Sequence, residues 1–128
     1  MITEHDLLIR VRYQETDAMQ RVHHANYITY FEMGRTELLR AKGLSYAQIE
    51  QDGLFLVVAE VNCRYLLPAT YDEELLLRTK LISAKGAKIE HGYEIFRGLE
   101  LLATGKTVIA CVDRQGRVRR IPDSLKMP

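Results

Sequence analysis

One acid and two adjacent histidines, Asp17, His23 and His24, stand close together in the segment RYQETDAMQRVHHANYITYFEMGR, residues 12–35. A carboxylate can act as a general base or as a nucleophile. The residues after the histidines have a helical pattern, and a helix N-terminus offers free amide donors and a positive dipole end that favour an oxyanion. The same residues could instead form an Asx turn and a solvated surface. Two interpretations therefore stay open, a structural turn or a catalytic site at a helix N-terminus.

The helix that must position these groups is predicted over residues 26–42. Residues at three- and four-residue steps would form one stripe along this helix: Tyr27, Tyr30, Phe31, Gly34, Leu38 and Ala41. Asn26 is a suitable N-cap and Gly43 a suitable C-terminal stop. Glycine costs about 1 kcal/mol relative to alanine inside a helix, so Gly34 on this stripe indicates a close approach to another element, most simply a sheet. A shorter helical turn is expected over residues 46–51.

The rest of the chain has the composition of strands. Segments rich in β-branched residues occupy residues 6–13, 54–68, 74–83, 88–97 and 101–113. Gly98-Leu99 has the Gly-X form of a type II′ hairpin, which makes the strands around it antiparallel neighbours. The pattern predicts an α+β fold with one domain over residues 1–128, in which a single antiparallel sheet wraps around one long central helix.

The segment YQETDAMQRVHHANYITYFEMGRTELL resembles the signature of hot-dog-fold acyl-CoA thioesterases of the 4-hydroxybenzoyl-CoA thioesterase type. The sharp part of the match is Tyr13, Thr16-Asp17 and residues 24–27. Further along, YLLPATYDEELLL resembles the family's strand, proline, Tyr-Asp turn and next strand. The resemblance covers the whole chain in element order. It implies a single hot-dog domain that hydrolyses acyl-CoA thioesters, and we expect no cofactor and no metal.

The resemblance also implies a role for each residue of the motif. Asp17 would be either the general base on water or a nucleophile that forms a mixed anhydride, and backbone amides near His24 would hold the carbonyl oxygen. His24 itself could act through its side chain, through its amide alone, or only pack beneath the loop. Tyr13 either packs in the core or orients Asp17 or substrate through its hydroxyl. We expect His23 at the surface or at an interface.

Substrate binding is expected to involve Asn26 and Tyr27 at the start of the helix. Coenzyme A carries phosphates, and the candidates to meet them are Lys85 and Lys88, which flank Gly86; the alternative for these lysines is simple solvation of the turn. One departure concerns the residues after the acid. Where the family commonly has a glycine, this chain has DAMQR, so the loop must follow a different path or narrow the pocket.

A homodimer is the minimum assembly that the resemblance implies, and a homotetramer is also expected. The strand that contains Val58, Ala59 and Glu60 would line the partner's site. Two other functions stay open: a hot-dog hydratase or dehydratase that uses His24 with Glu60, and a non-enzymatic acyl-CoA sensor. A panel of acyl-CoA and enoyl-CoA assays separates them.

Composition excludes some classes of protein. The 18 basic and 17 acidic residues nearly balance, which argues against a chain that coats nucleic acid or anionic membrane. The N-terminus has no signal-peptide pattern and no apolar run is long enough to span a membrane, so we expect a cytoplasmic protein. Cys63 and Cys111 lie in strand-like contexts without metal-ligand spacing and are expected to be buried free thiols.

Overall fold

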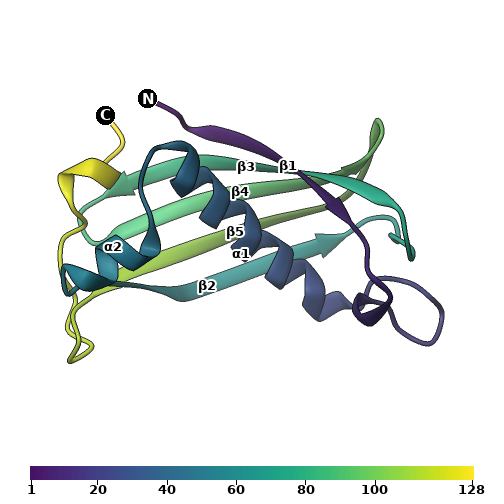
Figure 1. Cartoon of the computed structure of the whole chain (residues 1–128), viewed down its shortest axis with the longest axis horizontal. Helices are drawn as coiled ribbons and strands as arrows, with labels where there is room; N and C mark the ends of the chain where they lie inside the picture. The colour runs from purple at the N-terminus through teal and green to yellow at the C-terminus, as the bar shows by residue number, and fades with distance from the viewer.

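The five predicted strands form one antiparallel sheet in the computed structural model, which describes all of residues 1–128 (Figure 1). The strands are β1 (Glu4–Arg10), β2 (Phe55–Tyr65), β3 (Glu74–Lys85), β4 (Lys88–Arg97) and β5 (Glu100–Val112), in the spatial order β1-β3-β4-β5-β2. The type II′ hairpin between β4 and β5 is confirmed, because Gly98 has a φ of 59° and Arg97 pairs with Glu100 across it. β1 stops at Arg10, so the prediction that the first strand reaches residue 13 was wrong.

One long helix, α1 (His24–Ala41), lies across a face of this sheet, followed by the short α2 (Tyr46–Gln51) (Figure 1). Two short 3₁₀ turns complete the fold, η1 (Tyr13–Glu15) and η2 (Asp123–Leu125). Gly43 has a φ of 81° directly after α1, as the C-terminal stop requires. None of the helices combines the length and apolarity needed to cross a bilayer.

The N-terminus of α1 differs from the expectation. The helix begins at His24, and the N-cap is His23, whose Nδ1 accepts a hydrogen bond from the amide of Ala25 at 3.1 Å. Asn26 is therefore not the N-cap. An imidazole with a free ring nitrogen can take the capping role that is usual for Asn, Asp or Ser, and this brings the helix start to the two histidines.

Gly34 explains how closely α1 approaches the sheet. A Cβ atom at Gly34 would lie 2.2 Å from Oγ1 of Thr79 and 2.7 Å from Cδ2 of Leu77, both on β3. Any side chain here would have to push the helix away from the strand. The predicted close approach of helix and sheet is confirmed.

Two buried clusters fix the helix along its length. One packs the first half of α1 on the sheet, with Tyr27, Tyr30 and Phe31 against residues such as Leu75, Leu77 and Ile95. The other packs the second half, with Leu38 and Leu39 against Ala84, Ile89 and Ile109. Each end of the sheet therefore packs against one half of α1.

β2 is an edge strand that leaves apolar side chains in solvent. Val57, Val58 and Val61 are all exposed, and the pairing of β2 with β5 shifts register between Val58 and Glu60. Exposed apolar edge strands are surfaces that proteins usually cover with another element or another chain.

Candidate active site

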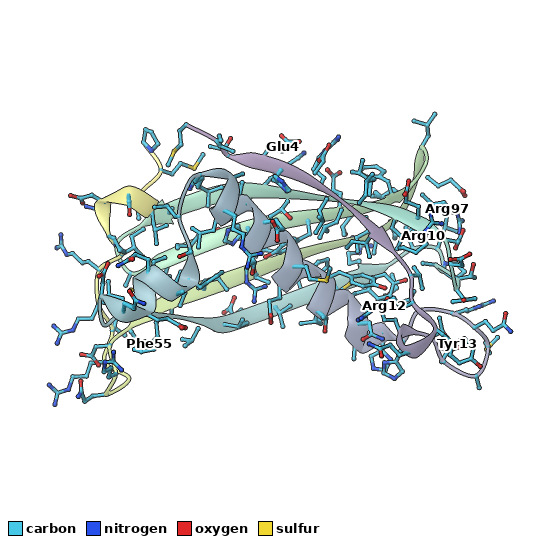
Figure 2. The ribbon with its side chains drawn as sticks, viewed as in Figure 1. Glu4, Arg10, Arg12, Tyr13, Phe55 and Arg97 are labelled. Carbon is cyan, nitrogen blue, oxygen red and sulfur yellow. The ribbon has the colours of Figure 1, made fainter.

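A cleft of about 330 Å³ opens at the N-terminal end of α1. Its walls come from the loop before the helix, the first turn of α1 and the chain that leaves β2: Asp17, Arg21, Val22, His24, Tyr27, Tyr65, Leu66, Leu67 and Pro68. The structure thus brings Asp17, His24 and Tyr27 together, as the sequence predicts. Figure 2 shows Arg12 and Tyr13 on the segment that enters this end of the molecule, and Phe55 at the opposite end.

Asp17 holds a turn and faces the cleft at the same time. Its Oδ1 accepts hydrogen bonds from the amides of Met19 at 2.9 Å and Arg21 at 3.2 Å. Its own amide donates to the carbonyl of Arg21 at 2.8 Å. Oδ2 makes no hydrogen bond within the chain. The Asx turn and a catalytic role are therefore compatible, because one oxygen is held and the other is free.

The loop after the acid keeps a glycine-like conformation without a glycine. Gln20 has a φ of 62°, in the left-handed region that a non-glycine residue adopts at a cost of about 1 to 2 kcal/mol. Its amide donates to the carbonyl of Asp17 at 2.9 Å, and its carbonyl accepts from the amide of Tyr71 at 3.1 Å. Neither Met19 nor Gln20 lines the cleft. The chain thus accommodates DAMQR by backbone strain, and these two side chains do not narrow the pocket.

His24 presents an amide donor at the edge of the cleft. The amides on either side are occupied, since that of His23 donates to the carbonyl of Glu15 at 2.8 Å and that of Ala25 to the His23 ring. The first amides of a helix have no acceptor inside it, and no loop carbonyl serves the His24 amide. The rings of His23 and His24 stack with centroids 4.2 Å apart. His23 is thus at the surface, as expected, but it also has the capping role described above.

A buried network beneath the loop fixes the helix start. The carboxylate of Glu15, which is only 5% exposed, accepts from the Arg12 amide at 2.8 Å and from the hydroxyl of Tyr30 at 2.9 Å. Burial raises the pKa of Glu15, but the bonds from Arg12 and Tyr30 outweigh it and the pKa lies below its usual range. Burial, followed by the Glu15 carboxylate, raises the pKa of Tyr30, which therefore stays a neutral donor. The carbonyl of Glu15 also accepts from Nδ2 of Asn26 at 2.8 Å, so Asn26 holds the loop and does not line the cleft.

Tyr13 does not reach the core or the cleft. Its side chain is 74% exposed, and its ring meets that of Tyr71 edge-on with centroids 5.6 Å apart. The alternative that Tyr13 packs in the core was wrong, because the chain leaves the sheet after β1. A role for its hydroxyl toward a bound substrate remains a proposal.

The remaining predicted residues lie away from this cleft within one chain. Val58, Ala59 and Glu60 are exposed in the middle of the free edge strand. Lys85 and Lys88 lie at the hairpin near the C-terminal end of α1, and a helix of 18 residues is about 27 Å long. A single chain therefore does not bring either group to Asp17. Glu60 does not line the cleft with His24, as the hydratase alternative would need.

Sequence reasoning missed Tyr65, which closes the cleft from β2. Its hydroxyl donates to the carbonyl of His24 at 2.8 Å, and its ring meets that of Tyr27 edge-on with centroids 4.9 Å apart. The only signal in the sequence was an aromatic residue near the end of a strand, which does not distinguish a cleft wall from a core residue.

Comparisons with known proteins identify the family and the fold of the chain. The model of the thioesterase-like superfamily matches residues 11–127. The acyl-CoA thioester hydrolase YbgC of Escherichia coli O157:H7 is 30% identical over 119 residues, which cover 91% of this chain and 89% of that protein. The acyl-CoA thioesterase YbgC of Haemophilus influenzae is 35% identical over 108 residues, which cover 82% and 78%. The solved structure of a DHNA-CoA thioesterase from Staphylococcus aureus superposes with a TM-score of 0.88 at 31% identity, covering 91% of this chain and 80% of that one.

The antiparallel sheet around one helix is thus the hot-dog fold of these enzymes, and the protein is a thioester hydrolase. The chain belongs to the thioesterase-like superfamily. The resemblance found in the sequence is confirmed.

Proposed function

We propose that the protein hydrolyses an acyl-CoA to a carboxylic acid and free coenzyme A, with Asp17 as the catalytic carboxylate. The observation that carries this proposal is the free Oδ2 of Asp17 in the same cleft as the first turn of α1. Acyl-CoA as the substrate class is supported by the names of the relatives, two of which are acyl-CoA thioesterases.

In the proposed reaction the carbonyl oxygen of the thioester accepts a hydrogen bond from the His24 amide, where the helix dipole stabilises the charge that develops. Asp17 then has two possible roles. As a general base, it takes a proton from the water that attacks the carbonyl carbon. As a nucleophile, it attacks that carbon itself, the coenzyme A thiolate leaves, and water hydrolyses the mixed anhydride. A single turnover in isotopically labelled water distinguishes them, because only the second route can place label in Asp17.

We propose that two chains pair through β2. The support is the exposed apolar edge of that strand, with Val58 at its centre. Antiparallel pairing about a two-fold axis exchanges the ends of β2, because the partner runs in the opposite direction. The partner's Lys85 and Lys88 would then come to the side of the cleft, where they could meet the phosphates of coenzyme A. A dimer is the minimum assembly, and a tetramer of such dimers is also compatible with this pairing.

The test is thiol release from a panel of acyl-CoAs by the wild type and by Asp17→Asn. Asparagine keeps the turn but removes the charge and the basic oxygen, so kcat should fall by about 10²-fold or more. Asp72→Asn is the matched control, because Asp72 is also an exposed loop acid and does not line the cleft. An Asp17→Asn protein with native melting and a kcat within a few-fold of wild type would remove Asp17 from the mechanism. Tight acyl-CoA binding without thiol release by the wild type would instead support the sensor, and hydration of an enoyl-CoA would support the hydratase.

A further inference from the structure

Arg35, in the second half of α1, is a buried cation without an anionic partner. Arg35 is only 8% exposed. Its Nη1 atom is fully shielded from solvent and makes no hydrogen bond. No carboxylate forms an ion pair with it; Glu32, one turn earlier on α1, is exposed. An unpaired buried charge costs several kcal/mol in the folded state, so some other group should meet this guanidinium.

A small cavity lies beside Arg35. Its volume is about 20 Å³, and its lining includes Arg35, Lys42, Tyr46, Ile89 and His91. A space of this size is suited to one small occupant, such as a water molecule or a halide ion. His91 on β4 is 7% exposed, and its Nδ1 is also shielded and without a hydrogen-bond partner. Two buried nitrogen atoms without a hydrogen-bond partner, Nη1 of Arg35 on α1 and Nδ1 of His91 on β4, thus belong to side chains that line one small space.

The charge around the cavity is positive. Its lining contains the cations Arg35 and Lys42 and no acid. Burial, together with the charges of Arg35 and Lys42, lowers the pKa of His91 to about 3, so its ring is neutral near pH 7. The residues paired with His91 on the neighbouring strands, Leu81 and Thr107, carry no charge. A water molecule would satisfy hydrogen bonds here but would leave the charge of Arg35 uncompensated, whereas an anion does both.

We propose that this cavity binds a monovalent anion of halide size, such as chloride, between the guanidinium of Arg35 and Nδ1 of His91. In the bound state His91 is the tautomer that carries its proton on Nδ1, so both groups donate to the ion. The site is separate from the catalytic cleft, because Arg35 lies about 16 Å along the helix from His24. The ion would hold the second half of α1 to β4.

The first test is thermal unfolding of the full chain in sodium chloride and in sodium gluconate at equal ionic strength. Chloride should raise Tm by a few degrees in a saturable manner, because a ligand that binds only the folded state stabilises it by mass action. Arg35→Gln should lose this chloride-specific shift. Arg120→Gln is the matched control and should keep it, because Arg120 is exposed and makes no ion pair.

The second test does not depend on the folding of a variant. Wild-type crystals grown in sodium bromide should show an anomalous peak within the cavity, in hydrogen-bond reach of Arg35 and His91. A Tm that is equal in chloride and gluconate, or an anomalous map without a peak at this cavity, would overturn the proposal.

Discussion

The hydroxyl of Tyr65 donates a hydrogen bond to the carbonyl oxygen of His24 at 2.8 Å and so joins the end of β2 to the first turn of α1. Burial, followed by the neighbouring Cys63, raises the pKa of Tyr65 to about 12, so the hydroxyl remains a donor near pH 7. The residue that carries the proposed oxyanion donor is therefore held by the edge strand as well as by its own loop.

Removal of this one hydroxyl should slow catalysis more than it weakens binding. Tyr65→Phe keeps the ring against Tyr27 but loses a bond worth about 1 kcal/mol, and it frees the first turn to shift. We expect kcat to fall roughly five- to tenfold with KM little changed. Steady-state kinetics of thiol release measure both constants. Tyr71→Phe is the control, since Tyr71 is exposed and outside the cleft; equal kcat in all three proteins would contradict the role of Tyr65.

Replacement of Gln20 should relieve the backbone strain in the loop that follows Asp17. Gln20→Gly removes the Cβ from a residue with a φ of 62°, so the free energy of unfolding should rise by up to about 1 kcal/mol after the entropy of glycine is offset. Urea denaturation measures this change. Gln20→Ala keeps the Cβ and should show no gain. If the glycine variant is less stable than the alanine variant, backbone strain at this position is not what limits stability.

His91 should make stability depend on pH. Its pKa is about 3 in the folded state and about 6.5 in an unfolded chain, so between these values the unfolded state binds the additional proton. Its contribution is complete above pH 6.5 and is lost as pH falls, at about 1.4 kcal/mol per pH unit. Urea denaturation in chloride-free buffer from pH 7 to pH 5 should show that His91→Gln has a shallower dependence than wild type. His5→Gln serves as control, and equal slopes for wild type and His91→Gln would contradict the burial of a neutral imidazole.

Charge reversal at the β3-β4 hairpin tests the proposed phosphate contacts. Lys85→Glu with Lys88→Glu should raise KM for acyl-CoA by about five- to thirtyfold, the equivalent of roughly 1 to 2 kcal/mol, and change kcat less. The reason is that these lysines would bind far from the reacting carbon. Lys80→Glu, a reversal in the middle of β3, is the comparison. An unchanged KM at low salt would exclude both lysines from the site.

A charge on the free edge should separate the subunits. Val58→Asp places a carboxylate in the proposed β2 pairing, so light scattering should show a shift to monomer and thiol release should fall with it. Ile82→Asp also replaces an exposed aliphatic side chain, but on β3, inside the sheet order, and should leave the β2 pair intact. A fully active monomer would contradict the shared site.

The fold could be predicted from the sequence because the signals for its helices, strands and turns lie in short segments of the chain. Alternation and turn glycines marked the strands, and Gly34 marked the contact between helix and sheet. The start of α1 was misplaced because an imidazole caps the helix where Asn26 had the better propensity. In the same way, the first strand was predicted to be too long because Val11 and Tyr13 continue the apolar alternation, although the regular pairing with β3 ends at Arg10.

Only those residues of the candidate site that lie together in one short segment could be predicted from the sequence. Asp17, His24 and Tyr27 come from a short stretch, and the structure brings them to one cleft. Tyr65 and Glu15 were missed because their bonds join residues 41 and 15 positions apart in the chain, to His24 and Tyr30 respectively. No periodicity encodes such pairs, which exist only after helix and sheet have packed.

The contact of Gly34 with Thr79 fixes the distance between α1 and the sheet. The packing of the core therefore also fixes the position of the His24 amide at the start of this helix. The cleft walls at Leu66 and Leu67 are exposed and belong to neither buried cluster, so they can be replaced without disturbing the helix. Substitutions at these two wall positions should therefore change the acyl group that fits the cleft without moving Asp17 or the first turn of α1, which form the proposed reacting centre.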